Sequence, residues 1–264
     1  MHLYTLKALF IQAFRSMARS LWIVGKNHAK VGAWRRFLGL HVVATPIGNQ
    51  SDLSPRAIEI IRESEFIIGE ELKPTTHLLK SHQLTPKKIK KLNEHSDPED
   101  LKELVELCRD HEVALVSDCG TPGFCDPGAD LVKLCRQQNI KVSSVPGPSS
   151  IATFLSLSGH RMDEFLFKGF LPAKEPSRSQ SIKDLKKQNI PCLLMDTPYR
   201  LKRLLEELAK FLPENNIVLG LNLSMDNELV LEGRADNILK QLPFEKAEFF
   251  LALMPLKKKK IKRN

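Results

Sequence analysis

The chain has 264 residues, 42% of them hydrophobic and 27% charged, a composition typical of a globular protein with a full hydrophobic core. No apolar run approaches the roughly 18 residues that cross a bilayer, so the sequence predicts no membrane span. The net charge of +9 comes from the two ends, because residues 1–40 carry seven Lys and Arg, residues 257–264 carry six, and neither stretch contains an acid. Residues 41–256 keep 27 basic and 31 acidic residues, a net charge of about −4. This argues against a nucleic-acid surface that spans the whole domain, although the basic ends can add affinity for RNA.

The cysteines show no CxxC pair and no spacing suited to zinc. They are Cys108, Cys119, Cys125, Cys135 and Cys192. Most of them fall in or beside expected strands and helices, as small buried thiols do in a reducing compartment. We therefore expect a cytoplasmic protein without a metal site.

Residues 1–40 differ in character from the rest of the chain. Apolar residues recur there at helical spacing, with Lys and Arg on the other side, which predicts a basic amphipathic extension. Three interpretations are open: a transit peptide of the mitochondrial type, a helix on a membrane surface, or upstream sequence translated from a start site assigned too early. We favour the third, because the first strand that can open a domain begins at His41. Residues 256–264 form a Lys-rich tail.

From His41 to about residue 160, short apolar strands alternate with amphipathic helices. We expect strands at 41–44, 66–68, 89–92, 113–116 and 141–145, helices at 75–82, 129–138 and 149–158, and two more that start at Pro55 and Pro98. Ser54 and Asp97 precede those two prolines as N-caps, and Ile58 and Ile61 are expected on the buried side of the first of these helices. The alternation predicts a mainly parallel sheet with helices on both faces.

The pattern restarts near Phe165. We expect strands at 165–167, 192–195, 217–221, 228–231 and 248–253, helices at 182–188, 199–211 and 235–242, and a long polar loop at 168–178. The predicted fold class is therefore α/β with two lobes, 41–160 with a mainly parallel sheet and 161–255 with a mixed sheet. A cleft between two such lobes is a common place for a small-molecule site.

A Gly- and Pro-rich segment follows the strand Val113–Val116. This central loop, residues 117–128, begins with Ser117 and Asp118 and contains three Gly and two Pro. Gly accepts positive φ and Pro fixes φ, so a loop with both holds an unusual shape. Open α/β sheets bind ligands at this end of their strands. The alternative is a tight turn in which Asp126 and Pro127 cap the next helix.

Five motifs occur in a characteristic order. They are Thr45-Pro-Ile-Gly-Asn49; Ser117-Asp-Cys-Gly-Thr-Pro-Gly123 with Asp126-Pro-Gly128; Pro146-Gly-Pro-Ser149; Phe165-Leu-Phe167 with Gly169-Phe-Leu-Pro172; and Pro198 with Arg200. In order and spacing they resemble the tetrapyrrole methylase superfamily, over about residues 41–253. Within it they are most similar to bacterial methyltransferases that modify the ribose 2′-oxygen of a cytidine in small-subunit ribosomal RNA.

The resemblance implies two α/β lobes with S-adenosylmethionine in the cleft between them, a ribosomal RNA partner and a homodimer. It assigns cofactor binding to Pro46, Ile47, Gly48, Asp118, Gly120, Thr121, Pro122, Ser149, Ser150 and Ile151. The residue types suit this role, because Gly and Pro loops bring backbone groups close to a ligand and Ser hydroxyls at a helix start can bond its polar atoms.

Methyl transfer to a ribose hydroxyl requires in-line placement of the acceptor and a group that takes its proton. Candidates near the expected acceptor side are Glu70, Glu71, Lys73, Glu94, His95 and Arg200, and the sequence does not single out one base.

The chain departs from the RNA-modifying family on the acceptor side. Gly69-Glu-Glu-Leu-Lys73 stands where that family usually has Ala-Glu-Asp-Thr-Arg, and Leu221 and Asn222 stand in place of an Arg-Glu pair. We also expect the small extra carboxyl-terminal domain to be missing. Two alternatives therefore stay open: a methyltransferase for a small molecule such as a tetrapyrrole, and a catalytically inactive module that binds the cofactor or RNA.

Overall fold

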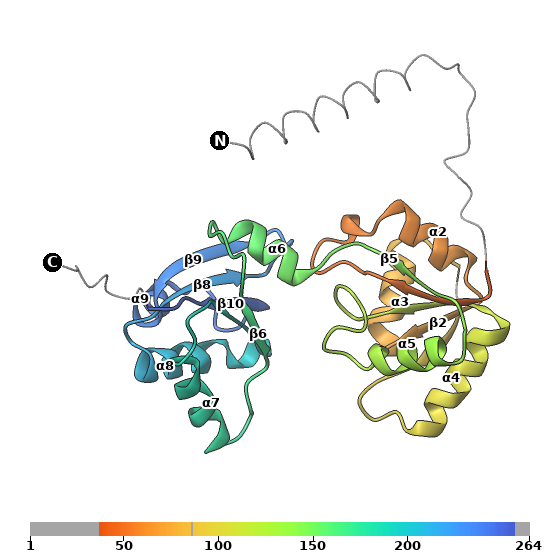
Figure 1. Cartoon of the computed structure of the whole chain (residues 1–264). Coiled ribbons are helices and arrows are strands. Elements are labelled where there is room, and N and C mark those ends of the chain that lie inside the picture. The colour runs from red at the N-terminus through yellow and green to blue at the C-terminus, as the bar shows by residue number, and fades with distance from the viewer. Residues whose placement is uncertain (1–36, 86, 257–264) are drawn as a thin grey trace, which may run out of the picture. The chain divides into compact units, whose positions relative to one another are not determined.

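Two five-stranded sheets organise the computed structural model, which describes residues 37–85 and 87–256 (Figure 1). The basic extension before residue 37 and the Lys-rich tail after residue 256 lie outside the described residues. Among those that are described, no helix is long and apolar enough to cross a membrane.

The first sheet is parallel throughout. Its strands are β1 (Gly39–Val43), β2 (Phe66–Gly69), β3 (Lys88–Lys91), β4 (Glu112–Val116) and β5 (Val142–Val145). They lie in the order β3-β2-β4-β1-β5, and each neighbouring pair is parallel. The central strand β4 is buried along its whole length. All carboxyl ends therefore meet at one edge of the sheet, where ligands bind in this kind of fold.

Helices cover both faces of this sheet. The helices α2 (Pro55–Glu63) and α3 (Leu72–Ser81) pack on one face, and α4 (Pro98–Asp110) and α5 (Gly128–Gln137) pack on the other. As predicted, Ser54 caps α2, its Oγ accepting from the Ala57 amide at 3.1 Å, and Asp97 forms a capping box with Asp100 at the start of α4. On the buried side of α2, Ile61 is fully buried as predicted, Ile58 packs against the core while partly exposed, and Ala57 and Ile60 are also buried.

The second sheet is mixed. Its strands are β6 (Leu166–Gly169), β7 (Cys192–Met195), β8 (Asn216–Leu221), β9 (Leu229–Arg234) and β10 (Phe249–Leu253). In the order β6-β7-β10-β8-β9, only the β6–β7 pair is parallel. The helices α7 (Ser177–Leu185), α8 (Leu201–Phe211) and α9 (Ala235–Gln241) cover one face, and α6 (Ser150–Leu157) packs on the other. The predicted fold class, with a parallel first sheet and a mixed second one, is confirmed.

One predicted loop was too long. The helix α7 begins at Ser177, five residues before the expected start at Ile182, because Pro176 precedes its first turn with a backbone that already has α-helical φ and ψ. Arg178 is consequently a helical residue, and its side chain is fully buried. The prediction of a polar loop up to residue 178 is therefore wrong for Ser177 and Arg178.

Candidate active site

Hydrogen bonds join three loops of the first sheet, and two of these loops meet at the carbonyl oxygen of Gly120. The amide of Thr45, after β1, donates to the Gly120 carbonyl at 2.8 Å, and the Ser117 hydroxyl, after β4, donates to it at 3.0 Å. The Thr121 hydroxyl reaches the loop after β5 by donating to the carbonyl of Pro148 at 3.1 Å. Gly120 has φ of +86°, a conformation that L side chains rarely adopt. The predicted loop platform is therefore held together by one backbone amide and by short hydroxyl side chains that donate to backbone carbonyls.

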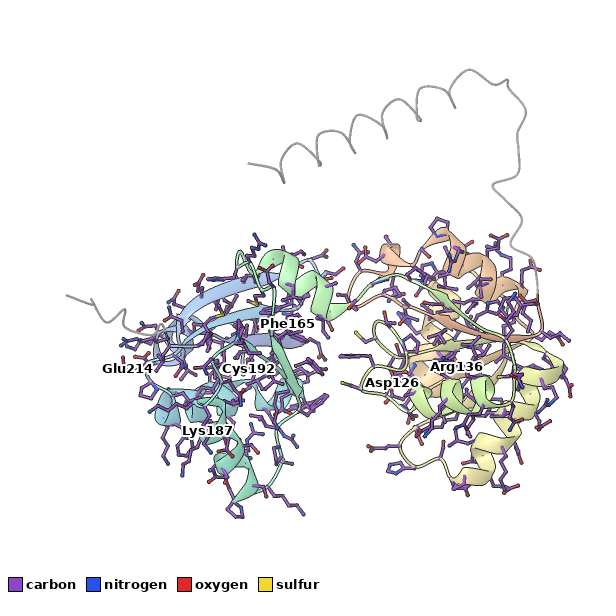
Figure 2. All side chains as sticks on the ribbon, in the orientation of Figure 1. Asp126, Arg136, Phe165, Lys187, Cys192 and Glu214 are labelled. Atoms are coloured by element: carbon purple, nitrogen blue, oxygen red, sulfur yellow. The ribbon has the colours of Figure 1, made fainter. Side chains whose placement is uncertain are left out.

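Asp126 closes the far end of the central loop (Figure 2). Its Oδ1 accepts hydrogen bonds from the Gly123 amide at 2.6 Å and from the Gly128 amide at 3.1 Å. The carboxylate therefore bonds the first residue of α5, as the turn interpretation predicts, and also fixes the shape of the loop.

A cavity of about 400 Å³ lies beside this platform. Its lining residues are Cys119, Gly120, Thr121, Phe124, Ser149, Ser150, Ile151, Ala152, Leu155 and Met195. Its volume falls in the usual range for small-molecule sites, and its walls are mostly apolar with a few polar groups. Ser149 precedes α6 without making a capping hydrogen bond, so its hydroxyl can bond a ligand.

Half of the predicted cofactor residues line this cavity: Gly120, Thr121, Ser149, Ser150 and Ile151. Pro46 and Asp118 instead line a small separate cavity of about 80 Å³ that also contains His77. Ile47 lines a wider hollow of about 520 Å³ next to Ser156 and Glu228, and Pro122 is buried without lining any of the three. The structure therefore does not bring all ten residues to one cavity.

Five lining residues were not predicted: Cys119, Phe124, Ala152, Leu155 and Met195. Two of them carried a usable signal, since Ala152 and Leu155 follow Ser149 at spacings of three and lie on one face of α6. Met195 carried none, because it comes from β7 of the second sheet, and nothing in its local sequence shows that it faces this loop.

The first-sheet loops pack directly against the second sheet. Ile47 lies in one apolar cluster with Phe154 of α6 and Phe250 of β10, and Phe124 of the central loop contacts Phe167 in a tilted arrangement with ring centroids 4.9 Å apart. At Gly48, a Cβ would lie 2.7 Å from the Leu223 carbonyl oxygen, so only glycine allows this close approach. Of the residues in these contacts, Phe124 also lines the cavity.

The acidic residues after β2 lie next to the central loop. The backbone amide of Glu71 donates to Asp118 Oδ1 at 3.4 Å, and the Glu71 carboxylate lies 2.8 Å from Lys91 Nζ and accepts from Asn93 Nδ2 at 3.3 Å. Two of the predicted acceptor-side residues, Glu70 and Glu71, are thereby placed beside the loop predicted to bind the cofactor.

The two adjacent carboxyls have opposite electrostatic environments. Burial raises the pKa of Glu70, and the negative charges of Asp118 and Asp126 raise it further. Hydrogen bonds from Lys91 and Asn93 lower the pKa of the exposed Glu71. Burial also raises the pKa of Asp118. Glu70 and Asp118 are thus the carboxyls in this group whose basicity is increased, as a proton acceptor requires, and of the predicted acceptor-side pair only Glu70 has this property.

The remaining acceptor-side candidates have no hydrogen bond or ion pair with the central loop among the contacts described. Glu94 and His95 form an exposed pair with 3.7 Å between Glu94 Oε1 and His95 Nε2, and Lys73 is exposed in the first turn of α3. Arg200, after β7, has its ion pair with Asp196 at 3.0 Å rather than with any of these residues.

A buried ion network holds Arg200 in place. Asp196 also pairs with Arg178 at 3.2 Å, and Arg178 pairs with Glu207 at 2.7 Å and donates to the carbonyl of Pro172 at 3.1 Å. The side chains of Arg178 and Asp196 are 0% and 1% exposed. The network ties the segment after β6, the end of β7 and α8 together.

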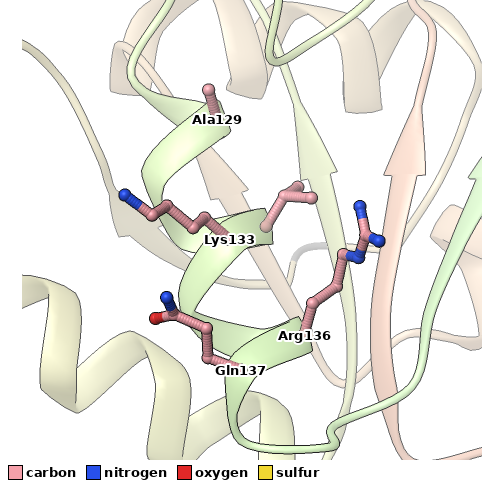
Figure 3. Close-up of a pocket in the computed structure, with 5 residues that line it drawn as sticks. Ala129, Lys133, Arg136 and Gln137 are labelled. Atoms are coloured by element: carbon pink, nitrogen blue, oxygen red, sulfur yellow. The ribbon is translucent and has the colours of Figure 1, made fainter.

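A hollow on the surface of α5 lacks the features of a site (Figure 3). It has about 430 Å³, and all its lining residues come from the one helix: Ala129, Val132, Lys133, Arg136 and Gln137. Lys133 and Arg136 extend to different sides of the helix, so no polar groups converge on a ligand. We also find no cluster of three or more His, Cys, Asp or Glu suited to a metal ion within residues 37–85 and 87–256.

Comparison with known proteins identifies the family. A profile described as Tetrapyrrole (Corrin/Porphyrin) Methylases matches residues 39–239, and the chain therefore belongs to this family of methyltransferases. Curated relatives include the Ribosomal RNA small subunit methyltransferase I of Synechocystis sp., 38% identical over 66% of this chain, and that of Leptospira biflexa, 31% identical over 88%. The matched regions span 62% of the Synechocystis protein and 97% of the Leptospira protein.

Solved structures share the fold. Diphthine synthase superposes with a TM-score of 0.67 over 82% of this chain and 89% of its own, at 18% identity. Uroporphyrin-III-C-methyltransferase from Thermus thermophilus gives 0.57 over 83% and 94%, also at 18% identity. At such low identity these neighbours establish the fold and not the substrate.

Proposed function

We propose that this protein is an S-adenosylmethionine-dependent methyltransferase that acts on a ribose 2′-hydroxyl of small-subunit ribosomal RNA. The observation that carries the proposal is the cavity between the central loop and the start of α6, which lies on the same sheet edge as the acidic residues after β2. The curated relatives that cover most of the chain are named for ribosomal RNA methylation, which supports the RNA substrate.

The residues around the cavity suit an adenosine-type cofactor. Apolar side chains from Ile151, Leu155 and Met195 can contact a base or ribose face, while the Ser149 and Ser150 hydroxyls and the backbone of Gly120 offer hydrogen bonds. When bound there, the cofactor supplies an electrophilic methyl group, so the protein's own task is to place the acceptor oxygen, exclude water and accept one proton.

Glu70 is the residue we assign to proton acceptance. Its raised pKa brings the carboxylate closer to the range in which a general base works well, and its neighbour Glu71 is already committed to Lys91 and Asn93. Arg200 can position the RNA through its guanidinium, because the buried pair of Asp196 and Arg178 fixes its place at the end of β7.

The proposal includes further features that follow the resemblance. We place the lobe boundary near residue 160, with lobes at 41–160 and 161–255, and we propose a homodimer that works in the cytoplasm. The alternative is a module that binds the cofactor without catalysis, which the altered residues Lys73, Leu221 and Asn222 favour.

Two measurements separate these possibilities. Titration calorimetry with S-adenosylmethionine tests binding, and mass mapping of small-subunit ribosomal RNA from a deletion strain tests methylation. We expect binding and the loss of one ribose methyl group. Binding without any lost methyl group would support the inactive module, and methylation of a tetrapyrrole but not of RNA would support the small-molecule alternative. No binding would contradict every version of the proposal that uses the cofactor.

A further inference from the structure

One stretch of residues 41–256 combines several lysines with no acidic residue. Between Glu71 and Glu94 the sequence has 22 residues with six lysines and no acid, which we name the basic segment, residues 72–93. Its lysines are Lys73, Lys80, Lys87, Lys88, Lys90 and Lys91. The other residues of 41–256 carry 21 basic against 31 acidic side chains, so the basic segment stands out against an acidic background.

The fold places this segment at one lateral side of the first sheet, where the strand order ends. It forms α3 and β3, and β3 is the edge strand, paired with β2 on one side only. Lys88, Lys90 and Lys91 of β3 are exposed. Lys88 and Lys90, two residues apart, extend from the same face of the strand, where Lys88 Nζ lies 5.1 Å from the centre of the Phe66 ring.

The charges of the basic segment are largely uncompensated. Outside the segment, Lys102 pairs with Glu99 of the same helix at 2.9 Å and Lys187 pairs with Asp184 at 2.5 Å, whereas Lys202 and Lys240 have no acidic partner among the described residues. Within the described residues, Lys91 alone of the six has an acidic partner, Glu71. A row of exposed, unpaired ammonium groups attracts polyanions in a way that depends on salt.

We propose that the basic segment binds the phosphate backbone of the RNA and guides a ribose to Glu70, an inference that rests on the proposed function. The strand β3 ends at Lys91, and Lys91 Nζ lies 2.8 Å from the Glu71 carboxylate, directly after the proposed base. Phosphate contacts fix the register of a nucleic acid without reading its sequence. The basic segment therefore orients the RNA strand, and the residues at the carboxyl ends of the β-strands act on one nucleotide.

A competing explanation needs only the edge position of β3. Lysines on edge strands prevent two sheets from pairing edge to edge, and this protective role requires no ligand. The two explanations differ in what the loss of charge does. A protective role predicts self-association with unchanged RNA affinity, whereas the binding role predicts weaker and less salt-dependent RNA binding.

The test compares two double variants of the full chain that remove the same charge. K88Q/K90Q removes two lysines of β3, and K202Q/K240Q removes two exposed lysines of α8 and α9 that have no acidic partner among the described residues. Small-subunit ribosomal RNA transcribed in vitro is titrated at several salt concentrations, with calorimetry for S-adenosylmethionine and light scattering for self-association. Methyl transfer is followed on small subunits isolated from the deletion strain.

A plot of log affinity against log salt concentration has a negative slope. We expect K88Q/K90Q to make this slope less steep by roughly 1.4 to 1.8, the value for two lost phosphate contacts. Its KM for the RNA substrate rises while its cofactor affinity stays unchanged, and K202Q/K240Q behaves like the wild type. Equal effects in both doubles, or self-association of K88Q/K90Q with wild-type RNA affinity, overturn the inference. RNA binding that depends on Lys88 and Lys90, without methyl transfer by the wild type, supports the inference and overturns the proposed enzyme.

Discussion

The central loop and the acidic residues after β2 are neighbours at the same sheet edge, yet they are built differently. The central loop is fixed by hydrogen bonds from the Thr45 amide and the Ser117 hydroxyl to the Gly120 carbonyl, and by Asp126, which accepts from two backbone amides. The acidic residues are fixed by ion pairs between exposed side chains, such as Lys91 with Glu71. Because surface ion pairs are weak and backbone geometry is rigid, changes on the acceptor side should alter chemistry more than stability, and changes in the loop should alter both.

The largest expected effect is on turnover, from E70Q. Loss of a general base lowers kcat/KM by roughly 10²- to 10⁴-fold, with cofactor affinity unchanged. In the wild type, the raised pKa of Glu70 places the acidic limb of the pH–rate profile above the ordinary pKa of glutamate, since the carboxylate must be deprotonated to act. E94Q, at the exposed Glu94, is the matched control and should retain activity within a few-fold. An E70Q enzyme with more than a tenth of wild-type activity would show that the base lies elsewhere.

Substitution of Arg178 should have the opposite effect to E70Q, because this buried charge contributes to stability and not to the reaction. R178L leaves Asp196 and Glu207 buried without their partner, so we expect a loss of about 3–5 kcal/mol in the free energy of unfolding. R203L removes an exposed guanidinium that also pairs with Glu207, and it should cost less than about 1 kcal/mol. Urea denaturation of both variants measures the difference. Similar losses in the two would mean that burial of Arg178 does not set its contribution.

Substitutions at two glycines can distinguish the effect of backbone strain on stability from the effect of loop shape on cofactor binding. Gly120 and Gly159 both have positive φ, +86° and +70°, so G120A and G159A should each cost about 1–2 kcal/mol of stability. An added Cβ at Gly120 lies 3.3 Å from Ile47 Cγ2, whereas at Gly159 it meets no atom within 4 Å. We therefore expect only G120A to weaken S-adenosylmethionine binding as well, which calorimetry can check. Equal cofactor affinity in both variants would separate the central loop from the cofactor.

The smallest expected effect is a gain in stability from E70Q at neutral pH. Burial raises the pKa of Glu70 in the folded protein, so the folded state holds this proton more tightly than the unfolded chain does. The wild type therefore loses stability relative to E70Q as pH rises from the unfolded pKa through the raised folded one, and the two converge at lower pH. Thermal unfolding between pH 4 and pH 8 follows this difference. A constant difference across that range would contradict the raised pKa.

The sequence predicted most of the fold because its signals were local. Apolar runs bounded by Gly and Pro marked the strands, and Ser54 and Asp97 marked two helix starts. The error at α7 has a physical reason. The burial of Arg178 depends on two acids, one directly after β7 and one in α8, which lie 18 and 29 residues further along the chain. Long-range charge compensation of this kind leaves no mark in the local pattern.

The candidate site was likewise predicted only in part. Residues set by loop shape, such as Gly120 and Thr121, were found, since Gly and Pro spacing carries loop conformation directly. Met195 was missed because its place depends on how the second sheet packs against the first loops. Glu70 was one of six acceptor candidates, and its burial beside Asp118 and Asp126, together with the bonds of Glu71 to Lys91 and Asn93, distinguishes the two carboxyls.

A crystal structure of the protein with S-adenosylhomocysteine, the demethylated form of the cofactor, tests the central claim most directly. The account predicts ligand density in the cavity lined by Gly120, Ser149 and Ile151, with the sulfur directed toward the Glu70 side of the sheet edge. Density in the hollow beside Ser156 and Glu228 instead, or an empty cavity at saturating ligand, would contradict it.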